Sequence, residues 1–191
     1  MEPSREQAWA LLTEYTTNES LIKHALAAEA AMRAYARRFG EDEETWGVVG
    51  LIHDFDYEQN PTFDKHVYVG ARILRDRGWP EDIVVAVESH ADYLNIPRTT
   101  PIRKTLFAVD ELVGFITAVT LVRPSKSIMD LEASSVRKKM KDKAFARAVS
   151  REDIVKGAES LDLPLDEHIS FVIGAMRGIA GELGLEGTQE A

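Results

Sequence analysis

The sequence predicts an all-α protein, a single-domain helical bundle formed by residues 1–191. Apolar residues recur at intervals of three and four along most of the chain, which is the period of an amphipathic helix. Helix-capping residues precede several of these stretches. We find no run that alternates between apolar and polar residues as a half-buried strand would. A chain of this length can bury one hydrophobic core without disulfides.

The first half of the chain is expected to form five helices. A capping box of Ser4 and Gln7 begins the first. Pro80, followed by two acidic residues, begins the fifth, because proline suits the first helical turn and acidic side chains favour the helix N-terminus. A loop over residues 55–61 precedes the fourth. The expected helices cover residues 4–15, 18–39, 43–54, 62–78 and 80–93.

The second half begins with the longest apolar helix, expected over residues 102–122. The pattern then weakens over residues 124–149 into short, basic helical pieces. Ser150 caps the next short helix, and Pro164 begins the last helix, whose apolar stripe continues to Leu183.

The composition excludes several kinds of site. The chain contains no cysteine, which excludes disulfides, thiolate zinc sites and cysteine nucleophiles. A transition metal would therefore need nitrogen and oxygen ligands. No stretch approaches the roughly 20 apolar residues that span a bilayer, and the N-terminus lacks a secretion signal. We therefore expect a cytoplasmic protein without a membrane partner.

The charge is unevenly distributed. The formal net charge of −9 disfavours nucleic acid as a partner. Residues 123–151 nevertheless carry nine lysines and arginines against three acidic residues, whereas the rest carries 14 basic and 29 acidic residues. This basic segment could receive a phosphate or could be a solvated helix face. It lacks the interleaved aromatic residues of a surface that stacks on bases.

Polar residues on apolar helix faces are the main anomaly, because burying an unpaired polar group is costly. Each of these residues alone is explained by a buried hydrogen bond or a helix cap. Together they place four histidines on or beside the apolar faces of four helices and an aspartate on a fifth. A helical bundle uses such a distribution to bring metal ligands together in its interior. The residues are His24, His53 with the adjacent Asp54, His66, His90 and Asp110.

The order His24, then His53-Asp54, then Asp110 resembles the H…HD…D signature of the HD-domain superfamily of metal-dependent phosphohydrolases. The resemblance covers residues 20–122. His66 and His90 match the two additional histidines of the dinuclear subgroup. The remaining residues, 123–191, resemble the C-terminal extension of small uncharacterised bacterial HD proteins. The resemblance thus implies an HD-type bundle with extra C-terminal helices.

The resemblance also implies a ligand set and a reaction. His24, His53, Asp54 and Asp110 would bind one metal, and Asp54 would bridge to a second metal held by His66 and His90. One or two divalent transition-metal ions (Fe, Mn, Co, Ni or Zn) suit such ligands. Water activated by the metal would cleave a phosphate ester of a nucleotide or small metabolite, with His53 and Asp54 at the catalytic centre.

One departure from the family pattern bears on substrate binding. Many HD proteins continue the dipeptide as His-Asp-Ile-Gly-Lys, where the lysine contacts phosphate, but here the run is His-Asp-Phe-Asp-Tyr-Glu. Tyr57 and Glu58 could relay protons or pack the loop. Arg123 and Lys126 are the first candidates to bind the substrate phosphate, and exposed helix-end charge is the alternative. His168 lies outside the motif and is interpreted as structural.

Two other functions remain open. Myo-inositol oxygenase and its relatives use the same ligand arrangement with two iron ions to activate oxygen. A non-catalytic module could instead use the site only to bind a metal or ligand. The oligomeric state does not follow from the sequence.

Overall fold

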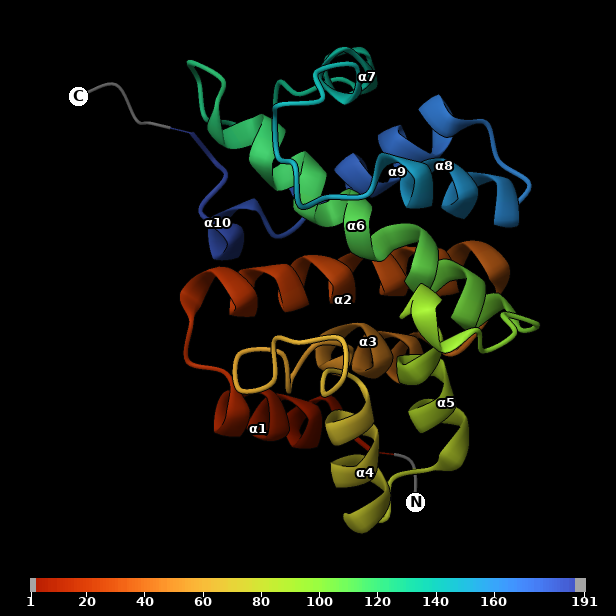
Figure 1. The fold of residues 1–191 in the computed structure, drawn as a ribbon. Helices are drawn as coiled ribbons and strands as arrows, with labels where there is room; N and C mark the ends of the chain where they lie inside the picture. The colour runs from red at the N-terminus through yellow and green to blue at the C-terminus, as the bar shows by residue number, and fades with distance from the viewer. Residues whose placement is uncertain (1–2, 188–191) are drawn as a thin grey trace. The chain divides into compact units, whose positions relative to one another are not determined.

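The computed structural model describes residues 3–187, which are mainly helical (Figure 1). Within these residues there is no strand, and the single isolated β-bridge joins Ser127 to Glu186. The prediction of an all-α protein is therefore confirmed. None of the helices in the described part combines the length and hydrophobicity needed to cross a bilayer.

The chain divides into two compact units, Met1–Phe107 and Ala108–Ala191. The arrangement of residues 1–191 as one domain, with a core over 20–122 and an extension over 123–191, stays a prediction. The first unit contains α1 (Arg5–Tyr15), α2 (Glu19–Phe39), α3 (Glu43–Ile52), α4 (Tyr68–Asp76), α5 (Glu81–Ser89) and a short 3-10 helix, η1 (Asp92–Leu94).

Helix α3 is the centre of the first unit. It contacts α1, α2 and α5, and every residue from Trp46 to Ile52 is buried. Gly50 allows α2 to come close, because a Cβ atom there would lie 2.9 Å from the carbonyl oxygen of Ala28 on α2. These backbone atoms cannot move aside as a flexible side chain would. The close crossing brings the middle of α2 to the C-terminal end of α3.

Two helix boundaries in this unit differ from the prediction by four residues or more. The helix expected over residues 62–78 begins only at Tyr68, because Val67 has a φ of 65°, which interrupts helical geometry. The preceding residues, including His66, form turns. The helix expected over 80–93 ends at Ser89, and His90 occupies its C-cap.

Helix α6 (Pro101–Leu121) begins in the first unit and continues into the second, which also contains α7 (Ala133–Met140), α8 (Arg151–Ser160), α9 (Leu165–Arg177) and α10 (Ala180–Leu183). Helix α9 contacts α7 and α8. The single final helix expected from Pro164 to Leu183 is interrupted at Gly178 and Ile179, so that prediction was wrong. Ile179 has a φ of −126°, which is outside the helical range.

Arginines of the basic segment satisfy backbone groups of the second unit. The Arg151 guanidinium donates hydrogen bonds to carbonyl oxygens of the loop that precedes it and lies over the Phe115 ring, 4.7 Å from its centroid. The accepting residues are Asp142, Phe145, Ala146 and Val149. Part of the positive charge in this segment therefore stabilises an irregular loop.

Candidate metal centre

Five of the six predicted ligands come together in the first unit. His24 lies on α2, His53 is the C-cap of α3, and Asp54 follows it in a turn. His66 precedes α4, and His90 is the C-cap of α5. We call these five residues the His–Asp cluster. Four of them, all but His24, stand at or just outside a helix end, where the backbone can direct a side chain away from the helix axis.

Asp54 lies between two pairs of histidines and offers a different oxygen to each. Its Oδ2 is 3.8 Å from Nε2 of His24 and 3.5 Å from Nε2 of His53. Its Oδ1 is 3.1 Å from Nε2 of His66 and 3.3 Å from Nε2 of His90. The cluster therefore contains two ligand sets that share one carboxylate.

Three of the imidazole rings are held in place through Nδ1. His53 Nδ1 donates to the carbonyl oxygen of Gly50 (2.8 Å), and His90 Nδ1 donates to that of Val87 (2.5 Å). His66 Nδ1 donates to a carboxylate oxygen of Asp56 (3.2 Å). Because each acceptor can only accept, these bonds fix the tautomer and leave Nε2 as the ligand atom when the ring is neutral.

When His53, His66 and His90 are neutral, the Nε2 atoms that they direct toward Asp54 are therefore acceptors. Nε2 of His24 lies 3.1 Å from Nε2 of His53, and both face the Asp54 carboxylate. Lone pairs at such distances repel one another unless protons or a cation lie among them. Imidazole nitrogens with one carboxylate form the donor set that divalent transition metals prefer. The residues present therefore fit the metal that the sequence predicts.

The pKa values of Asp54 and His66 also indicate that the cluster favours positive charge. Burial alone would raise the pKa of Asp54, but His53, His66 and His90 hold it well below its ordinary value. Burial alone would lower the pKa of His66, but hydrogen bonds to Asp54 and Asp56 raise it to about 9. Without a metal, His66 therefore keeps a proton at neutral pH, and a metal would have to displace it.

Asp56 contacts the His–Asp cluster directly, and sequence reasoning did not single it out as a site residue. It is buried, and one carboxylate oxygen accepts from His66 while the other accepts from the backbone N–H of Gly70 (3.2 Å). A Cβ atom on Gly70 would lie 2.8 Å from this carboxylate, so the glycine makes room for it. The signal was present in the sequence, since Asp56 departs from the family's His-Asp-Ile-Gly-Lys run.

The remaining predicted site residues lie in the second unit. Asp110 lies on α6, three residues after the boundary at Phe107, and its role as a ligand stays a prediction. Arg123 donates to the side chains of Asp130 and Ser135, and Lys126 has a φ of 50°. Their predicted contact with substrate phosphate likewise stays a prediction.

His168 contributes to packing in the second unit. It is fully buried, and its Nε2 donates to the carbonyl oxygen of Ala108 (2.9 Å). A Cβ atom on Gly157 would lie 2.6 Å from Cα of Ala108, so α8 also approaches this part of α6 closely. This environment agrees with the structural interpretation of His168.

The two residues considered as proton relays have different surroundings. Glu58 accepts hydrogen bonds from the backbone N–H groups of Thr17 (2.7 Å) and Asn18 (2.9 Å), and these bonds lower its pKa. It therefore ties the loop after the cluster to the start of α2. The Tyr57 ring instead contacts the His66 ring edge to face, with 5.1 Å between centroids. Of the two, Tyr57 lies beside the cluster.

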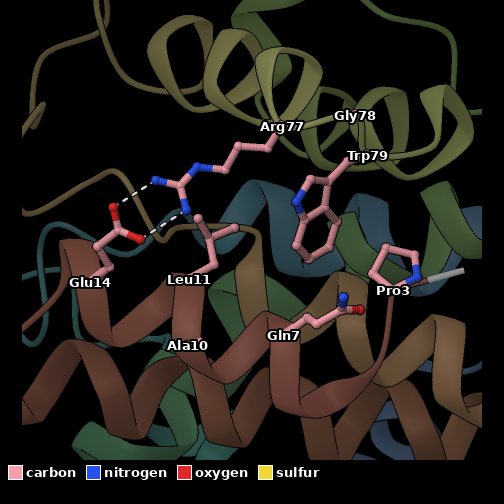
Figure 2. Close-up of a pocket in the computed structure, with 8 residues that line it drawn as sticks. All are labelled: Pro3, Gln7, Ala10, Leu11, Glu14, Arg77, Gly78 and Trp79. Atoms are coloured by element: carbon pink, nitrogen blue, oxygen red, sulfur yellow. Dashed lines mark hydrogen bonds and ion pairs between the residues drawn. The ribbon is translucent and has the colours of Figure 1, made fainter. Parts of the chain in front are cut away.

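The first unit also contains a groove of about 420 Å³ between α1 and the turn that joins α4 to α5 (Figure 2). Figure 2 shows the Arg77 guanidinium bound through two hydrogen bonds to Glu14, with the Trp79 indole on the other side of Leu11 in this view. Arg77 is therefore already neutralised and does not offer a free positive charge to a phosphate. The groove is lined by Pro3, Gln7, Ala10, Leu11, Glu14, Arg77, Gly78 and Trp79, none of which belongs to the His–Asp cluster.

Comparison with known family models shows what the chain is similar to. The family model described as HD domain matches residues 21–156, which is well over half of the chain. The matched region contains all six predicted ligands. No curated protein matches the sequence.

Proposed function

Because the chain belongs to the HD-domain family, whose members are generally metal-dependent hydrolases, we propose that it hydrolyses a phosphate ester of a small molecule. The observation that carries this proposal is the division of the His–Asp cluster into two ligand sets around Asp54. A pair of metal ions sharing a carboxylate is a common arrangement for cleaving phosphate esters.

Each residue of the cluster has a defined task in this proposal. His24, His53 and Asp54 hold one ion, with Asp110 as the predicted fourth ligand. Asp54, His66 and His90 hold the other. When bound, such ions lower the pKa of a coordinated water and offset the negative charge of the phosphoryl oxygens.

The surrounding residues keep the ligand atoms in position before substrate arrives. The Nδ1 hydrogen bonds to Gly50, Val87 and Asp56 prevent the three rings from turning. Asp56 also adds negative charge behind His66, which makes its ring a better donor to a cation. Rings already held in place need little rearrangement when charge develops in the transition state.

Metal content per chain tests the proposal, measured by mass spectrometry on protein purified without chelators or oxygen. We expect two equivalents in the wild type, about one in His90→Ala and a clear loss in His53→Ala. His168→Gln is a matched control, because this histidine hydrogen-bonds Ala108 in the second unit and should leave metal content unchanged.

The metal identity then decides the activity assay. Manganese, cobalt or nickel leads to a panel of phosphomonoesters and phosphodiesters, in which hydrolysis should depend on the metal and on His53. Iron with substrate-dependent oxygen uptake and no phosphate release would overturn the hydrolase in favour of the oxygenase. A protein that binds no metal even after reconstitution would overturn both.

A further inference from the structure

The groove between α1 and the α4–α5 turn has no part in the proposed hydrolysis. Its volume of about 420 Å³ lies in the range of ligand-binding pockets, and its lining residues all belong to the first unit. Leu11 is buried and Ala10 carries only a methyl group, so the α1 side of the groove is largely apolar. Figure 2 shows the Trp79 indole reaching from the turn toward α1, between Leu11 and Pro3 in this view. We call this space the Trp79 groove.

The backbone of Trp79 is held by the turn around it. Gly78 has a φ of 74°, and the backbone N–H of Trp79 donates to the carbonyl oxygen of Leu74 near the end of α4 (3.0 Å). Pro80 follows, and a proline restricts the residue before it to an extended backbone. The ion pair of Arg77 ties the same turn to α1. The indole is therefore carried on a restrained backbone, so that little ordering is needed when a ligand binds.

The Trp79 groove offers hydrogen-bond donors and carries no net charge. The Gln7 side-chain oxygen accepts from the backbone N–H of Ser4 (2.9 Å) in the capping box of α1, which leaves the NH₂ group of Gln7 to act as a donor. Within residues 3–187, neither this NH₂ group nor the indole N–H of Trp79 donates to a protein group. The one carboxylate among the lining residues is that of Glu14, and both of its oxygens accept from Arg77 (2.8 and 2.6 Å).

We propose that the Trp79 groove binds a proline-rich segment of a partner protein in the polyproline II conformation. Such a segment has no internal hydrogen bonds, and its proline rings pack in grooves lined by aromatic side chains. Between Gln7 and Glu14, α1 rises about 10 Å, which about three residues of polyproline II span in one turn. The Trp79 groove is thus long enough for one turn of the segment.

The charges of the groove favour this partner over others. The indole and amide N–H groups carry partial positive charge, which the unpaired carbonyl oxygens of polyproline II complement. Proline has no N–H group, so the segment brings few donors that the groove would leave unpaired. A helical peptide would satisfy its own carbonyl oxygens and leave the donors of Gln7 and Trp79 without acceptors. A phosphate or an anionic lipid would find no unpaired positive charge, because Arg77 is bound to Glu14.

Titration of the full chain with two blocked peptides tests the inference. One is octaproline, and the other is a glycine–serine peptide of the same length that has no preference for polyproline II. Calorimetry gives the dissociation constants, and a nitrogen–proton correlation spectrum follows the indole N–H signal of Trp79. We expect octaproline alone to bind and to shift this signal. Removing an anchoring tryptophan from an interface costs about 30-fold or more in affinity, and we expect this loss for octaproline in Trp79→Ala.

Three further variants separate recognition from folding. Gln7→Glu keeps an acceptor for the Ser4 N–H, since glutamate also completes a capping box, but it removes the NH₂ donor. We expect it to weaken octaproline binding by about 2- to 12-fold at an unchanged melting temperature. Trp79→Phe keeps a ring and loses only the indole N–H, so its affinity should lie between those of the wild type and Trp79→Ala. Trp9→Ala is the matched control, because Trp9 is also on α1 but does not line the groove, and it should leave the affinity unchanged.

Three outcomes would overturn the inference. The first is octaproline that does not bind at millimolar concentration, or that binds Trp79→Ala as well as the wild type. The second is equal binding of the glycine–serine peptide, which would show that the groove does not select polyproline II. The third is a wild-type dimer, measured by analytical ultracentrifugation, that dissociates in Trp79→Ala and does not bind octaproline, which would assign the groove to a second copy of the chain. Loss of the proposed hydrolysis would leave the inference intact, because no lining residue belongs to the His–Asp cluster.

Discussion

Replacing Asp56 by asparagine should weaken one half of the metal centre and spare the other. The two carboxylate oxygens of Asp56 accept two N–H groups, from His66 and from Gly70. Asparagine has one acceptor oxygen, so it can serve only one of these donors and must present its own NH₂ group to the other. It also removes the negative charge behind the His66 ring.

The expected loss of metal affinity follows from the strength of the hydrogen bond between Asp56 and His66. A hydrogen bond to a charged group is worth about 1.5–3 kcal/mol, and loss of the partner behind a metal-binding histidine typically costs about 10- to 100-fold in affinity. A 100-fold change corresponds to about 2.7 kcal/mol, so the two magnitudes agree. We expect this loss for the ion held by Asp54, His66 and His90, and little change for the ion at His24 and His53.

Competition with a chromophoric chelator measures both dissociation constants. Asp42→Asn is the matched control, because Asp42 also accepts a backbone N–H, from Thr45, but does so as the N-cap of α3, where asparagine serves equally well. Wild-type affinity for both ions in Asp56→Asn would refute the reasoning. Equal loss of both ions, together with a lower melting temperature, would show that Asp56 supports the fold and not one ligand set.

Three further predictions concern the same unit. Gly50→Ala should destabilise the protein by about 1–3 kcal/mol and lower its metal content, because the added methyl group meets the backbone of α2; an unchanged melting temperature would contradict this. Protein freed of metal should lose stability as the pH rises from 6.5 to about 9, because protonated His66 stabilises the folded state below 6.5 and this contribution disappears as the proton leaves. Thermal unfolding across that range checks it, and His66→Gln should remove the slope. Glu58→Gln should lower the melting temperature without changing metal-dependent hydrolysis, since Glu58 supports the start of α2; a loss of kcat at normal stability would reinstate it as a proton relay.

Some candidate ligand positions were predictable because a polar residue there interrupts an apolar pattern. His53 follows the apolar face of its helix, and His90 ends another apolar stripe, so their polarity is conspicuous in the sequence alone. The structure brings both into one cluster with His24, Asp54 and His66. The order of these residues along the chain also predicted the HD-domain family, and the match over residues 21–156 confirms that prediction.

Asp56 was less predictable, because a carboxylate in a loop is ordinary. Its role depends on the approach of Gly70, 14 residues later, which leaves little trace in local periodicity. The start of α4 was missed for a related reason. Val67 adopts a positive φ, and a β-branched residue rarely does so, so the sequence carried no sign of the interruption.

The closeness of α2 and α3 at Gly50 also limits how related chains can be interpreted. If related chains were compared only at the ligand positions, every chain that keeps the histidines and aspartates would be judged equally able to bind metal. A chain with a larger residue at position 50 would have to separate the two helices, and with them the nitrogens of His24 and His53. A glycine at position 50 is therefore a second criterion, beside the ligand residues themselves, for deciding whether a related chain can form the metal site.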